Sequence, residues 1–223
     1  MALLASIPPL TGTAQAAAEN HEMHDHSGHS HSPDAKALKE QAIATAVKAN
    51  DMEAARLLLK DWLRLGGDPN TMVFMGLVLR HPDFTRLLIA EGANPNATAQ
   101  GMYKGVPALQ VSLLEGEPLL ALTLIQAGAN VHQRDPKGHT ALMAAAVAGY
   151  FDVVKALLEH KADVRAKNGV SQTALQMMTQ NLERARLSAQ MYTQYQRIVG
   201  VLDEAELIQL NKAKLQQPER TSP

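Results

Sequence analysis

The sequence repeats itself with a period of about 33 residues. Leu109, Leu142 and Leu175 lie 33 positions apart, and the alanine that precedes each of them has the same spacing. Further pairs at this offset are Gly116 with Gly149, Leu124 with Leu157, Ala129 with Ala162, and Val131 with Val164. A fixed period of this length indicates one supersecondary unit that is stacked on copies of itself. We therefore predict a solenoid in which each unit packs only on its neighbours.

The composition limits what such a stack can contain. Lys plus Arg number 21 and Asp plus Glu number 22, so no net charge attracts nucleic acid or an anionic membrane. Cysteine is absent, which excludes disulfides and thiolate metal sites. No apolar run reaches the roughly 18 residues of a membrane-spanning helix. Aromatic residues make up only 4% of the chain, so its core must be mainly aliphatic, which suits thin layers of helices.

The spacing of apolar residues within one period indicates two helices. Leu142, Ala145 and Ala146 follow the i, i+3, i+4 pattern of a helix face. Thr140 is placed to cap this first helix, and Gly149 to end it in a left-handed conformation. A second amphipathic helix follows, with apolar residues Val153, Val154, Leu157 and Leu158.

Residues 138–167 resemble the ankyrin repeat. Where that family begins T-P-L-H-x-A, this sequence has Thr140-Ala141-Leu142-Met143-Ala144-Ala145, and Lys161 stands where the family has a turn glycine. The resemblance implies an all-α ankyrin-repeat solenoid of about five helix-turn-helix units over residues 35–212, followed by a C-terminal tail, 213–223. Met143 and Gln176 replace the family's histidine, so we expect its hydrogen-bond network to be absent and apolar packing to dominate.

Two units depart from the family period. The second unit, residues 71–96, spans only 26 residues, and we expect it to have shortened helices. In the last unit the second helix is predicted at 195–207, with Ile198, Val199 and Leu202 in its core. This placement implies an insertion of about 12 residues.

Ankyrin repeats bind partners through their turn fingers and the concave face of their first helices. Carried onto this chain, the resemblance makes another protein the expected partner. It selects Met143, Val147 and Gln176 on the helices and His132, Gln133, Arg134 and Lys137 on the fingers. The finger at residues 97–104 is three residues longer than its neighbour and carries Met102 and Tyr103. Two interpretations of Tyr103 are open, since exposed tyrosine and methionine are enriched in interfaces, whereas tyrosine can also fold back onto the stack.

Residues 1–18 resemble the end of a secretory signal peptide. A short apolar stretch is followed by small residues, with Ala-x-Ala cleavage sites ending at Ala16 and Ala18. The positive segment of such a peptide is missing, because the first basic residue is Lys36. We expect an exported, periplasmic protein. The alternative is an Ala-rich terminus of a cytoplasmic protein.

Five of the nine histidines fall in residues 19–34, which are too polar to fold alone and are expected to be disordered. They are His21, His24, His26, His29 and His31. Imidazole suits copper, zinc and nickel, so this segment is a candidate metal site. The alternative interpretation is a solvated linker whose charge changes near pH 6.5, the ordinary value for histidine. If cleavage follows Ala18, the new terminus Glu19-Asn20-His21 can hold Cu(II) or Ni(II) in a square plane, whereas cleavage after Ala16 destroys that site.

The sequence contains no motif of an enzyme. It lacks a glycine-rich phosphate loop, a nucleophile elbow and a zinc-protease helix, and His132 with His139 lacks further metal ligands nearby. We predict a monomeric, non-enzymatic adaptor that binds another protein and needs no cofactor. The alternative function is a metal-handling accessory protein that uses the His-rich segment.

Overall fold

The computed structural model describes residues 33–184 and 188–215, all within one compact unit, Pro33–Pro223. This described part contains ten α-helices and one short 3-10 helix, and it has isolated bridges but no strand. The elements are α1 (Pro33–Lys48), α2 (Met52–Arg64), α3 (Pro69–Val78), α4 (Pro82–Ala90), η1 (Gly101–Tyr103), α5 (Ala108–Leu114), α6 (Pro118–Gln126), α7 (Ala141–Ala148), α8 (Phe151–Glu159), α9 (Ala174–Arg184) and α10 (Ala189–Leu215).

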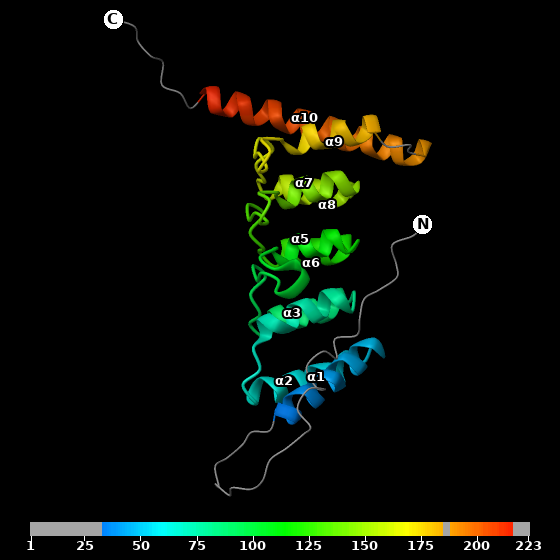
Figure 1. Cartoon of the computed structure of the whole chain (residues 1–223), viewed down its shortest axis with the longest axis vertical. Helices are drawn as coiled ribbons and strands as arrows, with labels where there is room; N and C mark the ends of the chain where they lie inside the picture. The colour runs from blue at the N-terminus through cyan, green and yellow to red at the C-terminus, as the bar shows by residue number, and fades with distance from the viewer. Residues whose placement is uncertain (1–32, 185–187, 216–223) are drawn as a thin grey trace, which may run out of the picture. The chain divides into compact units, whose positions relative to one another are not determined.

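The helices form five antiparallel pairs, and each pair packs on the next (Figure 1). The first helices α3, α5, α7 and α9 contact one another in order, and so do the second helices α2, α4, α6, α8 and α10. The predicted all-α solenoid of about five helix-turn-helix units is confirmed. Its buried core is continuous and almost entirely aliphatic, with Trp62 and Phe84 as its largest members.

Left-handed residues turn the chain at both ends of most units. Asn50, Arg80, Gly116 and Gly149 stand between the paired helices of the first four units. Gly149 is buried and has a φ of 78°, the left-handed conformation predicted for the residue that ends α7. After the second helices the corresponding residues are Gly66, Gly92, Gly128 and Lys161. Lys161 therefore adopts the glycine conformation, with a φ of 64°.

The hydrogen bonds at the starts of α7 and α9 correct the prediction that the bonds made by the family's histidine are absent here. Thr140 Oγ1 accepts a hydrogen bond from Met143 N at 3.3 Å, and Met143 Sδ accepts one from Thr140 N at 3.4 Å. In the last unit Gln176 Oε1 accepts the equivalent bond from Thr173 N at 3.0 Å. The residues that replace the family's histidine thus retain hydrogen bonds at the start of their helices, because sulfur and amide oxygen are also acceptors.

The expectation of shortened helices in the second unit is wrong. Helices α3 and α4 have 10 and 9 residues, against 8 and 9 in α7 and α8. The missing residues come from the connection, because α3 begins at Pro69, five residues after α2 ends at Arg64, without a finger between them.

The fifth unit takes up its extra residues as helix. Helix α9 has 11 residues and α10 has 27, and α10 begins well before the predicted residue 195. Ile198 and Leu202 are buried as predicted. The N-terminal half of α10 is tied to the fourth unit, because Tyr195 Oη donates to the carbonyl of Val147 at 2.8 Å and Gln194 Nε2 to that of Gly149 at 2.9 Å.

The described helices run from Pro33 to Leu215, and the predicted repeat domain is 35–212. None of the described helices is both long and apolar enough to cross a membrane. The predicted signal segment, 1–18, and the predicted metal ligands His21, His24, His26, His29 and His31 lie outside the described residues.

Candidate partner-binding groove

The first helices of units three to five enclose a groove of about 430 Å³. Its walls come from α5, α7 and α9, and one end is closed by the turn that precedes α7. The lining residues are Gln110, Leu113, Leu114, Asp135, His139, Met143, Ala144, Val147, Ala148, Tyr150 and Met177. We call this hollow the groove. Its walls are mostly apolar. Gln110, Asp135 and His139 form its polar end, and Tyr150 lies beyond the other end of α7.

An apolar stripe runs along the first helices and through the groove. Val78, Leu114 and Val147 each lie two residues before a left-handed residue, so they share one register position on α3, α5 and α7. Leu114 is 57% exposed and Val78 66% exposed, while Val147 is half-buried. We call these three residues the stripe. Neighbouring helices repeat the same position, so the exposed apolar side chains form a row.

Hydrogen bonds hold the polar end of the groove rigid. Asp135 Oδ1 accepts bonds from the backbone N of Lys137 at 2.9 Å and of His139 at 2.7 Å. Asp135 Oδ2 lies 3.0 Å from His139 Nδ1. Gln110 Nε2 donates to the carbonyls of Gln133 and His139 at 3.1 and 2.9 Å, which joins α5 to the turn.

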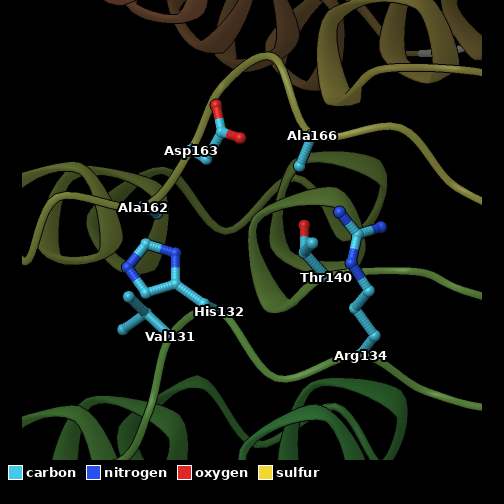
Figure 2. A pocket seen from close by; sticks show the side chains of 7 residues that line it. All are labelled: Val131, His132, Arg134, Thr140, Ala162, Asp163 and Ala166. Carbon is cyan, nitrogen blue, oxygen red and sulfur yellow. The ribbon is translucent and has the colours of Figure 1, made fainter.

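A second hollow of about 220 Å³ lies between the turns of units four and five, and Figure 2 shows it from close by. His132 and Asp163 stand on one side, and Arg134 lies across from them. Arg134 Nη1 donates to the carbonyls of Gly138 at 3.0 Å and Lys167 at 2.5 Å. The guanidinium therefore links one turn to the next, which is a structural role.

The long finger is closed by a bridge between Thr98 and Pro107, and its neighbour by one between Arg134 and Thr140. The first bridge encloses three more residues than the second, as predicted, and these extra residues form η1. Tyr103 packs against the core, and its Oη donates to Glu115 Oε1 at 2.5 Å. This bond, together with burial, raises the pKa of Tyr103. Of the two interpretations, the one in which Tyr103 folds back onto the stack is confirmed.

The residues predicted to bind a partner lie on different parts of the structure. Val147 lines the groove, Met102 stands 82% exposed on the long finger, and Lys137 and Gln176 are exposed. His132 and Arg134 face the second hollow, whereas Gln133 is half-buried and its Nε2 donates to the carbonyl of Asn96 at 3.3 Å. Met143 also lines the groove, although it is only 1% exposed. Its sulfur is turned inward to cap α7.

His132 and His139 do not form a metal pair, because they line different hollows. No cluster of three or more His, Asp or Glu side chains suited to a metal ion occurs among the described residues. His81 instead caps α4 by accepting a bond from Phe84 N at 3.3 Å. His160 Nδ1 bonds the carbonyl of Ala156 at 2.9 Å.

Among the groove residues that the sequence patterns did not select are Gln110, Leu114 and Asp135. Leu114 precedes Val147 by 33 positions, so the period contained the signal for it. Nothing in the period distinguishes Gln110 and Asp135, because their role depends on hydrogen bonds between α5 and a turn more than 20 residues away.

Comparison with known proteins agrees with this architecture. The family model described as "Ankyrin repeats (3 copies)" matches residues 75–168 and again residues 109–184. The chain is also similar to the ankyrin repeat and KH domain-containing protein mask of Drosophila melanogaster, with 39% identity over 82 residues. That alignment covers 36% of this chain but only 2% of the fly protein. Residues 75–184 are ankyrin repeats, modules of protein–protein interaction, and the described chain is an all-α ankyrin-repeat solenoid.

Proposed function

We propose that this protein is a non-enzymatic adaptor that binds another protein through the groove and the stripe. The observation that supports this proposal is the row of exposed aliphatic side chains at one register position of successive first helices. Isolated exposed apolar residues are common, but a contiguous row beside a hollow is typical of an interaction surface. The helices are fixed by packing and caps, so a partner would meet a surface that is already ordered.

Leu114 and Leu119 provide a matched pair of variants to test the proposal. Both are exposed leucines, at 57% and 65%, but Leu114 lines the groove on α5 whereas Leu119 lies on α6 and does not. Neither change should unfold the chain, because surface substitutions usually alter stability by about half a kcal/mol or less. Leu114→Glu should abolish capture of the partner from the native compartment, and Leu119→Glu should leave it intact.

The measurement is affinity capture with each variant, followed by mass spectrometry and then by binding of the purified partner. Thermal unfolding of both variants serves as the control for folding. Equal capture by Leu114→Glu and the unchanged chain would remove the groove from the proposed interface. Loss of capture with both variants would place the interface on a wider surface than the first helices.

A second candidate function is metal handling by the His-rich segment. It is supported by composition, because five of the nine histidines fall within residues 21–31. Deleting residues 21–31 separates the two functions. An adaptor retains its partner after the deletion, whereas a metal-handling protein loses its metal-dependent phenotype.

Export to the periplasm is also proposed from the sequence, because residues 14–18 contain two Ala-x-Ala sites of the kind at which signal peptides are cleaved. Intact-mass analysis of the protein from its native compartment tests it. A chain that begins at Glu19 should bind one Cu(II) with four nitrogen ligands, and this site should disappear with His21→Ala alone. A chain that begins at Ala17, or that retains Met1, would rule out this site.

A further inference from the structure

The groove contains an acidic side chain but no lysine or arginine. Asp135 is the single carboxylate among the lining residues, and no lysine or arginine lines the groove. His139, the remaining titratable base there, is bonded to Asp135. The Asp135 side chain is only 14% exposed, so its charge lies in a setting where water screens it poorly. An anionic group that entered the groove would meet this charge, with no lysine or arginine among the lining residues to offset it.

At the polar end, the side-chain groups that remain able to bond a ligand are hydrogen-bond acceptors rather than donors. Gln110 Nε2 already donates to two backbone carbonyls, so the amide group can offer an incoming ligand only its oxygen. Nδ1 of His139 is already occupied by its bond to Asp135. Asp135 itself is an acceptor. A ligand that satisfies this end must therefore bring hydrogen-bond donors.

We infer that the groove binds a linear peptide segment of the partner in which a lysine or arginine side chain reaches Asp135. The apolar side chains of the same segment lie along Leu114 and Val147, whose spacing on neighbouring helices provides the apolar contact. This inference rests on the proposed function and specifies the chemistry of the partner. A charge-assisted bond to a largely buried carboxylate is stronger and more selective than one on the open surface.

The groove should prefer cationic peptides over apolar or acidic ones, because these peptides differ in whether they supply a partner for Asp135. A cationic side chain pairs with Asp135 and donates hydrogen bonds to the acceptors of the polar end. A purely apolar segment would cover the remaining acceptor capacity of Asp135 without supplying a donor, which is costly. An acidic segment would add repulsion to that cost.

The test uses a random dodecapeptide library displayed on phage and selected against the full chain. We expect the selected peptides to combine Arg or Lys with Leu, Ile, Val or Met. The leading peptide is then synthesised with its arginine replaced by citrulline, which keeps the shape, or with its lysine replaced by acetyl-lysine. Both changes remove the positive charge. Binding should weaken by about tenfold or more, and the affinity of the charged peptide should fall as salt is added.

Three variants at Ala144 test the same point from the side of the protein. Ala144 is half-buried in the groove, one turn beyond the cap of α7. Ala144→Lys, Ala144→Gln and Ala144→Glu introduce side chains of similar reach but different charge, and Ala144→Gln controls for bulk. The peptide should bind about tenfold more weakly to Ala144→Lys than to Ala144→Gln, and at least as tightly to Ala144→Glu.

The outcomes separate this inference from the proposed function. Selected peptides that are neutral or acidic, or that tolerate citrulline, would overturn the cationic ligand while leaving the adaptor function intact. If no peptide is selected, or if Leu114→Glu leaves peptide binding unchanged, a linear segment in the groove is ruled out. Self-association that Leu114→Glu abolishes, measured by sedimentation, would identify a second copy as the occupant and would also overturn the inference.

Discussion

Tyr103→Phe tests whether the long finger is held against the stack by one hydrogen bond. The finger, residues 97–104, contains η1 and places Tyr103 Oη 2.5 Å from Glu115 Oε1 at the end of α5. The variant removes only the hydroxyl and keeps the ring, which packs against the core. Any change in stability therefore reports the hydrogen bond rather than lost packing.

The expected magnitude follows from the surroundings of the bond. A hydrogen bond to a charged group contributes about 1.5–3 kcal/mol when its partners are well buried. Tyr103 and Glu115 are both only half-buried, and water can reach the carboxylate once the hydroxyl is removed. We therefore expect Tyr103→Phe to lower the free energy of unfolding by about 1 kcal/mol. For a chain of this size the loss corresponds to a shift of roughly 2–4 °C in Tm.

The assay is urea unfolding followed by far-ultraviolet circular dichroism, in a double-mutant cycle with Glu115→Gln. If the two side chains interact, the double variant should be less destabilised than the sum of the single variants. Met102→Ser is the matched control, because Met102 adjoins Tyr103 but is 82% exposed and should not alter stability. Additivity within about 0.3–0.5 kcal/mol would show that the bond contributes nothing and would refute the reasoning.

The same bond predicts a dependence on alkaline pH. The pKa of Tyr103 is raised because its hydrogen bond to Glu115, and secondarily burial, favour the protonated phenol. Because the folded pKa exceeds the unfolded value of about 10, the contribution is complete below that pH and is lost as pH rises through the folded pKa. Tyrosinate absorbance should show Tyr103 titrating late, and Glu115→Gln should lower its pKa. Tyr195, whose pKa is also raised, mainly by burial, is the internal reference.

Three further variants test the packing of the repeats, each by urea unfolding. Leu142→Ala should cost about 2–5 kcal/mol because Leu142 is fully buried, and a loss below about half a kcal/mol would show that it lies outside the core. Lys161→Gly should stabilise the chain by about half to 1 kcal/mol, since a left-handed residue other than glycine is strained; unchanged or lower stability would contradict that strain. Gly169→Ala should destabilise, because the added Cβ would lie 2.8 Å from the carbonyl oxygen of Lys137 on the preceding turn. Retention of full stability would mean that the two turns can separate freely.

The period predicted most of the fold. The 33-residue spacing located the paired helices of units three and four, the cap at Thr140 and the left-handed turn at Gly149. It also located Ile198 and Leu202 in the core of the last unit, although the residues inserted there had no counterpart elsewhere in the chain. These features depend on neighbours within one or two turns of helix, and so they are visible in a single sequence.

The predictions of helix length that differ from the structure concern the two units whose length departs from 33 residues. A short unit can lose residues from its helices or from its finger, and the length of the period does not distinguish the two. In the second unit the helices kept their length, because Pro69 and Pro82 start α3 and α4 at positions where their apolar faces can still reach the core. Extra residues in the last unit extended α9 and α10 rather than forming a loop.

A stack of helix pairs could be predicted from local sequence patterns, because helix periodicity, caps and turn residues act between near neighbours. Which side chains remain available to a partner depends instead on how the repeats pack. Met143 and Tyr103 resemble contact residues in the sequence, yet one caps its own helix and the other bonds Glu115. Conversely, Gln110 and Asp135 meet at one end of the groove only because α5 packs against the turn before α7. Burial and hydrogen bonding between repeats depend on which residues meet when the chain folds. The periodicity of the sequence does not show which residues these are.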